Sequence, residues 1–206
     1  TAGLAVTTVI AYLTMNTSVM DSLIRNPMIV IGALIGQIVL VIALAGFINK
    51  MSPAVAAATF LGYSALTGFT LSLVVYSYTA GTVTAAFVTT AALFAVMTVV
   101  GFTTKTDLTK FRTLAVFALI GLLVAMGVNI FLASSMLNMV ISFIGVILFI
   151  GLLAIDTQRI KLMAASPELQ ADSSVAARMA IVGALTLYLD IINLFLFLMR
   201  LLGGRR

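Results

Sequence analysis

The sequence predicts an all-α membrane protein that forms a single integral membrane domain over residues 1–206. The chain is 63% hydrophobic and 8% charged, whereas soluble domains carry about 25% charged residues. Its apolar residues gather in runs of the length that an α-helix needs to cross a bilayer, which is about 20 residues. No soluble fold could bury this much apolar surface, so we expect the lipid bilayer to be the main partner of the chain.

Hydropathy divides the chain into seven apolar segments, and we expect each to be a transmembrane helix. The segments cover roughly residues 1–15, 27–48, 53–78, 83–102, 113–133, 136–155 and 179–202. Pro27 and Pro53 begin the second and third segments, as suits a residue that favours the first turn of a helix. The first segment is short and lacks the basic start of a signal peptide, so we interpret it as the remainder of a helix truncated at its N-terminus. The long connection from Asp156 to Arg178 is expected to begin as an extension of the sixth helix.

The distribution of lysine and arginine predicts the orientation of the chain in the membrane. If the N-terminus is cytoplasmic, the loops on the far side carry Arg25 alone. The cytoplasmic loops then carry seven such residues: Lys50, Lys105, Lys110, Arg112, Arg159, Lys161 and Arg178. Cytoplasmic loops of membrane proteins are enriched in these residues, so we expect a cytoplasmic N-terminus. Arg205 and Arg206 leave two alternatives open, because they lie outside if the last helix spans fully and inside if it is re-entrant.

Composition and motifs exclude several classes of function. The net charge of +5 follows from membrane topology, and no basic stripe is interleaved with aromatics, so we expect no nucleic-acid partner. The absence of cysteine and histidine excludes disulfides, thiolate metal sites and the usual pH switch. No Walker loop, glycine-rich dinucleotide turn, nucleophile elbow or HExxH motif is present, and no aspartate follows the Gly-x-Gly of intramembrane aspartyl proteases. We therefore expect that the protein is not an enzyme and has no organic cofactor.

Asp190 is the most informative residue of the chain. It lies in an apolar run, and the nearest charged residues, Arg178 and Arg200, are twelve and ten positions away. On a helix these spacings correspond to about 18 Å and 15 Å. A carboxylate at that depth in hydrocarbon costs about 2.5 kcal/mol or more on insertion scales. We therefore interpret Asp190 as a functional carboxylate that faces a cavity, an ion path or a buried partner.

Asp156 ends the sixth segment on the side from which the seventh enters the membrane. Alone, it is an interfacial residue with positive neighbours; beside Asp190, it becomes a pairing partner if the sixth helix is tilted or continues past it. Two carboxylates in contact cannot both ionise cheaply, and they titrate as a unit. Once ionised, they suit a hard cation such as Ca²⁺, which prefers several oxygen ligands. Asn193 and Thr186, each about one turn from Asp190, are candidate supporting oxygen donors.

The other polar residues have simpler interpretations. Gln37 lies in the middle of the second segment, where an interhelical hydrogen bond is favoured over a role in lining a pore. Four further acidic residues lie in polar turns or in the long connection, and we expect them to be solvated: Asp21, Asp107, Glu168 and Asp172.

Four stretches resemble the transmembrane Bax-inhibitor-motif family, in particular its bacterial YccA-type branch. Gly183–Phe195 resembles the C-terminal signature of the family, and Gly151–Gln158 resembles its sixth-helix Asp-Thr-Gln segment. Tyr63–Ser72 and Gly101–Leu108 resemble the bacterial branch. The resemblance spans nearly the whole chain, from the third apolar segment to the last.

The resemblance implies seven transmembrane helices with the C-terminal helix central, in the inner (plasma) membrane of a bacterium. It also implies a pH-dependent calcium leak whose di-aspartyl pH sensor is carried here by Asp156 and Asp190. Some members have an acidic residue in the middle of the second helix and an arginine near its end. This chain has Gln37 and Lys50 in those neighbourhoods, and Lys50 is only a weak substitute for an arginine latch.

The leading hypothesis is accordingly a pH-sensitive channel that leaks calcium or other cations. One alternative is a regulatory membrane protein that binds and modulates a membrane protease, as the resemblance to the YccA-type branch implies. The other is a proton-coupled transporter, which is weakly disfavoured because neither a broken helix pair nor an inverted repeat is visible.

Overall fold

The structure, a computed structural model, describes residues 2–167 and 171–203. This part of the chain is helical and contains no β-strand, so the predicted all-α class is confirmed. The helices pack into two compact units. Of the described residues, unit 1 contains 2–78, 167 and 171–188, and unit 2 contains 79–166 and 189–203.

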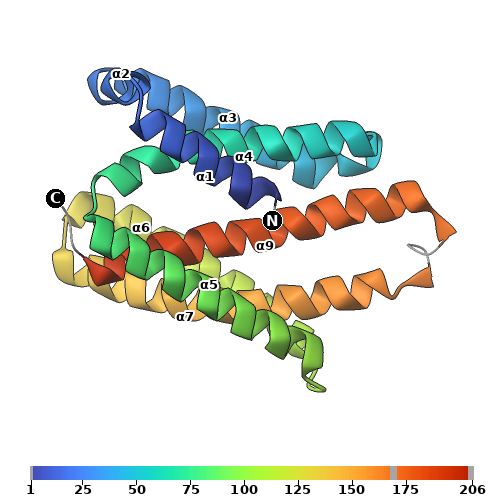
Figure 1. Ribbon diagram of the computed structural model, residues 1–206. Helices are drawn as coiled ribbons and strands as arrows, with labels where there is room; N and C mark the ends of the chain where they lie inside the picture. The colour runs from blue at the N-terminus through green and yellow to red at the C-terminus, as the bar shows by residue number, and fades with distance from the viewer. Residues whose placement is uncertain (1, 168–170, 204–206) are drawn as a thin grey trace. The chain divides into compact units, whose positions relative to one another are not determined.

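Unit 1 is organised around its longest complete helix, α4. Its elements are α1 (Ala2–Met15), α2 (Val19–Arg25), α3 (Pro27–Phe47), the 3-10 turn η1 (Ile48–Lys50), α4 (Pro53–Tyr76) and the first part of α9 (Ser173–Leu202). α4 packs against α1 and α3 (Figure 1). Gly68 allows the close approach of α4 to α1, because a Cβ at this position would collide with the backbone of Thr7.

Tyr188 of α9 lies in a buried aromatic and hydroxyl cluster within unit 1. Its ring makes edge contacts with Phe60 and Tyr63 of α4, with centroids 5.6 Å and 5.8 Å away. Its hydroxyl lies 2.6 Å from Thr7 Oγ1. Because the hydroxyl proton of Thr7 is donated to the carbonyl of Ser64 at 2.9 Å, the Tyr188 hydroxyl is the donor in the shorter contact. One hydroxyl thus joins α9 to α1.

Unit 2 is organised around α7. Its elements are α5 (Ala80–Thr103), the 3-10 turn η2 (Leu108–Phe111), α6 (Arg112–Leu132), α7 (Ser135–Ala164) and the last part of α9. α7 packs against both α5 and α6 (Figure 1). The tight connection between α6 and α7 places Ala133 in the left-handed region with φ 48°, and the Asn129 side chain accepts a hydrogen bond from Ser134 N at 3.1 Å to hold it.

Six helices of the described residues are long and apolar enough to cross a membrane, and α1 with α2 counts as a seventh if this pair, bent by 80°, forms one span. The expected extension of the sixth helix is confirmed, because α7 continues to Ala164. Asp21 was expected in a polar turn, but it lies in the first turn of the short helix α2, so that expectation is wrong. The last helix begins at Ser173 rather than at position 179. Its expected central position remains a prediction.

Candidate di-aspartyl site

The site is built from one carboxylate on α7 and one on α9, both within unit 2. Asp156 is 6% exposed and Asp190 is 5% exposed. They lie close enough for their charges to interact. The structure therefore places the two carboxylates that the sequence singled out in one unit and within range of each other's charge, on helices α7 and α9, and α7 continues past Asp156.

An aromatic pair sets the register of α7 against α9. The rings of Phe149 and Phe197 stack with centroids 5.7 Å apart and an interplanar angle of 26°. Asp156 follows Phe149 by seven residues, and Asp190 precedes Phe197 by seven residues. Seven residues are about two helical turns, so each aspartate lies on the same face as the phenylalanine of its helix. In this register, the antiparallel helices α7 and α9 carry their carboxylates at the same level. The stacking itself depends on Gly145, because a Cβ at this position would collide with the Phe197 ring.

The hydrogen bonding of the pair is incomplete among the residues that the structure describes. Asp190 Oδ2 is buried and has no hydrogen-bond partner there, and the same is true of Thr157 Oγ1, next to Asp156. No ion pair within 4.0 Å reaches either carboxylate in residues 2–167 and 171–203, although the charges of Arg112 and Arg159 act on Asp156. Buried polar atoms are usually satisfied. Oxygen atoms left in this state are suited to accept a proton, a water or a cation.

The contacts described for the four candidate supporting residues are with groups other than the two carboxylates, and their supporting role stays a prediction. Asn193 lies in unit 2 but donates to the carbonyl of Leu189 in its own helix at 2.8 Å. The other three belong to unit 1. Thr186 donates to its own helix at Val182, and Lys50 lies over the Phe47 ring at 5.8 Å. Gln37 joins α3 to α4.

The contacts of Gln37 fit the simpler of its two interpretations. Its Nε2 donates to Thr70 Oγ1 at 2.9 Å and to the carbonyl of Leu66 at 3.2 Å. Both acceptors are on α4, so Gln37 makes the interhelical hydrogen bonds that a polar side chain in a membrane helix commonly makes.

Two of the acidic residues that were expected to be solvated also cap helices. Asp107 accepts hydrogen bonds from the backbone and hydroxyl of Thr109 at the start of η2 and pairs with Lys110 at 4.0 Å. Asp172 accepts from Ser174 N at 2.7 Å, before the start of α9. The hydroxyl hydrogen bonds from Thr109 and Ser174 are the main reason that the pKa values of these two carboxyls lie below the usual 3.8. Glu168 lies outside the described residues.

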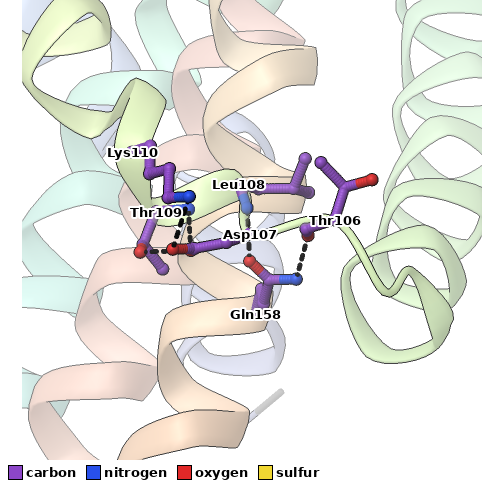
Figure 2. A network of polar contacts seen from close by, with 6 residues as sticks. All are labelled: Thr106, Asp107, Leu108, Thr109, Lys110 and Gln158. Carbon is purple, nitrogen blue, oxygen red and sulfur yellow. Dashed lines mark hydrogen bonds and ion pairs between the residues drawn. The ribbon is translucent and has the colours of Figure 1, made fainter.

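The residue that sequence reasoning missed is Gln158. Figure 2 shows its side-chain amide between the backbone groups of Thr106 and Leu108, in the connection from α5 to α6. The sequence drew attention to Gln158 only as part of the Asp-Thr-Gln stretch. Its amide side chain shortly after Asp156 was the available signal, but the partners are backbone atoms fifty residues away.

Comparisons with known proteins give consistent results over the whole chain. The model of the family described as Inhibitor of apoptosis-promoting Bax1 matches residues 1–206. Inner membrane protein YbhL of Escherichia coli (strain K12) is 44% identical over 207 residues, which cover 100% of this chain and 88% of the relative. A protein of Borreliella burgdorferi is 45% identical over 205 residues, 99% of this chain and 88% of the relative. A membrane protein of Streptococcus pyogenes serotype M6 is 43% identical over 181 residues, 88% of this chain and 77% of the relative.

Proposed function

The chain belongs to the family described as Inhibitor of apoptosis-promoting Bax1, and from this premise we propose that it is a pH-sensitive leak channel for calcium or other cations. The observation that carries the proposal is the burial of Asp156 and Asp190 together in unit 2. In this proposal the protein lies in the inner membrane with a cytoplasmic N-terminus. It catalyses no reaction, and Ca²⁺ and H⁺ are its small partners.

The proposed gate is the proton that the two carboxylates share. A shared proton makes a short, charge-assisted hydrogen bond that ties α7 to α9. Loss of this proton leaves two like charges in a poorly solvated place. At an effective dielectric near 20, charges about 4 Å apart repel by roughly 4 kcal/mol. A repulsion of this size is sufficient to bias two packed helices toward a slightly separated state that admits water or a cation.

The donor set suits a permeating ion better than a tightly held one. Ca²⁺ takes about 6–8 oxygen ligands, and the described residues contain no cluster of three or more acidic, histidine or cysteine side chains. Asp156 and Asp190 would therefore bind Ca²⁺ only with help from backbone oxygens, hydroxyls or water. Conduction requires binding that is favourable enough for entry but weak enough for exit, and in this proposal the two carboxylates supply such binding.

Calcium flux into liposomes that contain the purified protein tests the proposal. We expect flux to be low at acidic pH and to rise steeply as pH increases, because the shared proton is then lost. Asp190→Asn should blunt this response, since an amide does not titrate in this range, and Asp156→Asn should do so too. Asp21→Asn is the matched control, because Asp21 is an exposed carboxylate at the start of α2, and it should keep the wild-type profile.

A second candidate function follows if the flux experiment fails. Should both aspartate variants leave calcium flux and its pH profile unchanged, the pair is structural, and a regulatory protein that binds a membrane protease becomes the better proposal. The observation that favours this candidate is the charged connection from Thr104 to Asp107, which is exposed for most of its length yet anchored to α7. Co-purification with a membrane protease, lost when this connection is replaced, would support it.

A further inference from the structure

Gln158 links α7 to the connection between α5 and α6 through both ends of its amide (Figure 2). Its Oε1 accepts a hydrogen bond from Leu108 N at 2.7 Å, and its Nε2 donates to the carbonyl of Thr106 at 2.8 Å. Only one orientation of the amide satisfies both partners. The side chain is 6% exposed. Gln158 therefore fixes the position of this connection relative to α7.

Neighbouring residues of α7 hold the end of α5 at the same level. Lys161 Nζ donates to the carbonyl of Phe102 at 2.6 Å, which is one of the last carbonyls of α5 and has no partner within its helix. Gly101 allows α5 to approach α7 closely, since a Cβ there would lie 2.7 Å from the carbonyl oxygen of Ala154. The segment of α7 from Ala154 to Lys161 thus fixes both the end of α5 and the connection that follows.

This arrangement brings a positive charge toward Asp156. Arg112, the first residue of α6, follows Leu108 by four residues, and Asp156 precedes Gln158 by two residues. The hydrogen bond between Leu108 and Gln158 therefore anchors the start of α6, where Arg112 lies, to the segment of α7 that contains Asp156. The charge of Arg112 acts on Asp156, and so does that of Arg159 on α7 itself.

Arg112 is the residue next to the anchored connection whose positive charge acts on Asp156. Asp190 is the acidic neighbour on α9, and the described helix α5 carries no charged residue. Lys110 in η2 is engaged with Asp107 at 4.0 Å. Arg112 is exposed, so its influence on Asp156 passes partly through water and depends on ionic strength.

We propose that Gln158 is a positioning residue that keeps Arg112 beside Asp156, where the positive charge opposes the entry of divalent cations. This inference rests on the proposed function and adds to it a residue that sets apparent calcium affinity. The aspartate pair would determine whether cations pass, and Arg112 would determine the calcium concentration at which the site is half-filled.

Binding of radioactive calcium to the purified protein, measured beside flux, tests the inference. Arg112→Gln should lower the half-saturating calcium concentration about two- to fivefold at low ionic strength, and the difference should vanish in about 0.5 M potassium chloride. Gln158→Met should act in the same direction. The double variant should show no further change, because both substitutions remove the same effect. Lys110→Gln is the matched control, and its half-saturation should equal that of the wild type.

Hydrogen exchange of the Leu108 amide gives a readout that does not depend on calcium. Gln158→Met removes the acceptor, so exchange at Leu108 should accelerate, whereas Arg112→Gln should leave it unchanged. Gln158→Asn, whose shorter amide cannot reach both partners, serves if the methionine variant does not fold. Unchanged exchange in the Gln158 variants would overturn the inference, as would calcium binding that is indifferent to Arg112 or absent altogether. Binding that follows these expectations without any flux would instead overturn the proposed function alone.

Discussion

Phe149 of α7 stacks on Phe197 of α9 with ring centroids 5.7 Å apart, and this contact lies about two helical turns from Asp156 and Asp190. The stacked phenylalanines fix the axial register of α7 against α9. This register in turn determines where Asp156 and Asp190 lie relative to each other. An acidic pair is a poor device for holding helices together, since its attraction depends on a proton. The phenylalanine contact supplies the part of the α7–α9 packing that is independent of pH.

Phe197→Ala should lower the free energy of unfolding in detergent micelles by about 3 kcal/mol, the usual cost of removing a buried phenylalanine. Phe197 is 4% exposed, so its loss leaves a cavity against Phe149 and Gly145. The control is Phe131→Ala, because Phe131 is 88% exposed and should change stability little. Equal effects of the two variants would contradict the importance of the stacked pair.

Gly101→Ala should destabilise the protein, whereas Gly121→Ala should leave its stability unchanged or raise it. A Cβ at Gly101 would lie 2.7 Å from the Ala154 carbonyl and 2.8 Å from Thr157 Cβ, so α5 must move away from α7. At Gly121 of α6 no atom lies within 4 Å of the added Cβ, and alanine is the better helix former by about 1 kcal/mol. Thermal unfolding in micelles should show a lower transition for the first variant and an equal or higher one for the second.

Tyr188→Phe should cost about 1 kcal/mol of stability, because it removes the hydrogen bond that the phenol donates to Thr7. Thr7→Val should cost more, since it also removes the donor to the Ser64 carbonyl. The two substitutions should be non-additive when combined, as expected for residues in direct contact. Tyr12→Phe is the control, with Tyr12 63% exposed. Strict additivity in the double-mutant cycle would show that the 2.6 Å contact contributes nothing.

Asp172→Ala should lower the unfolding temperature by about 1–3 °C at neutral pH, since it removes an N-cap. The hydrogen bonds from Ser174 and Val175 depress the pKa of Asp172 below 3.8. Its stabilising effect is therefore fully present above pH 3.8 and is lost as pH falls through the lowered pKa of the folded state. The difference from wild type should shrink in that acidic range. Asp172→Asn should retain a cap that does not titrate, and a difference that persists unchanged into strong acid would contradict this account.

The proposed topology can be checked with single cysteines, because the natural chain has none. Ser166→Cys follows α7 and should react with a membrane-impermeant maleimide only after the cells are permeabilised, since the proposed cytoplasmic side carries most of the lysine and arginine. Thr17→Cys, between α1 and α2, should react in intact cells. The reverse labelling pattern would invert the orientation.

Hydropathy was sufficient to predict the all-α class, because the spans are made of apolar residues that soluble folds do not use. The same reasoning singled out Asp190, since burying a carboxylate among apolar residues costs free energy whatever the position of its helix in the fold. The sequence also predicted that Asp156 could pair with Asp190 if the sixth helix is tilted or continues past Asp156. The boundary at Ser173 was missed because Asp172 was interpreted as a solvated residue instead of a helix cap.

The contacts of Gln158 and Tyr188 could not have been predicted from local patterns. Gln158 bonds to backbone atoms of a connection fifty residues away, and Tyr188 bonds to a threonine 181 residues away. Backbone groups are present at every position, so no residue type marks the partner. α2 was missed for a related reason: Val19–Arg25 contains several polar residues, and its helicity depends on packing against neighbouring helices.

The amide of Gln158 also bears on where foreign sequence can be inserted. Surface connections usually tolerate added residues, but this one is fixed at two backbone groups only two residues apart. An epitope tag or fluorescent reporter placed between Thr106 and Leu108 would pull one group from the amide and leave a buried polar atom unpaired. Ala165 and Ser166 bond only back to α7 within the described part of the chain. A reporter is therefore better placed after Ser166 than in the connection between α5 and α6.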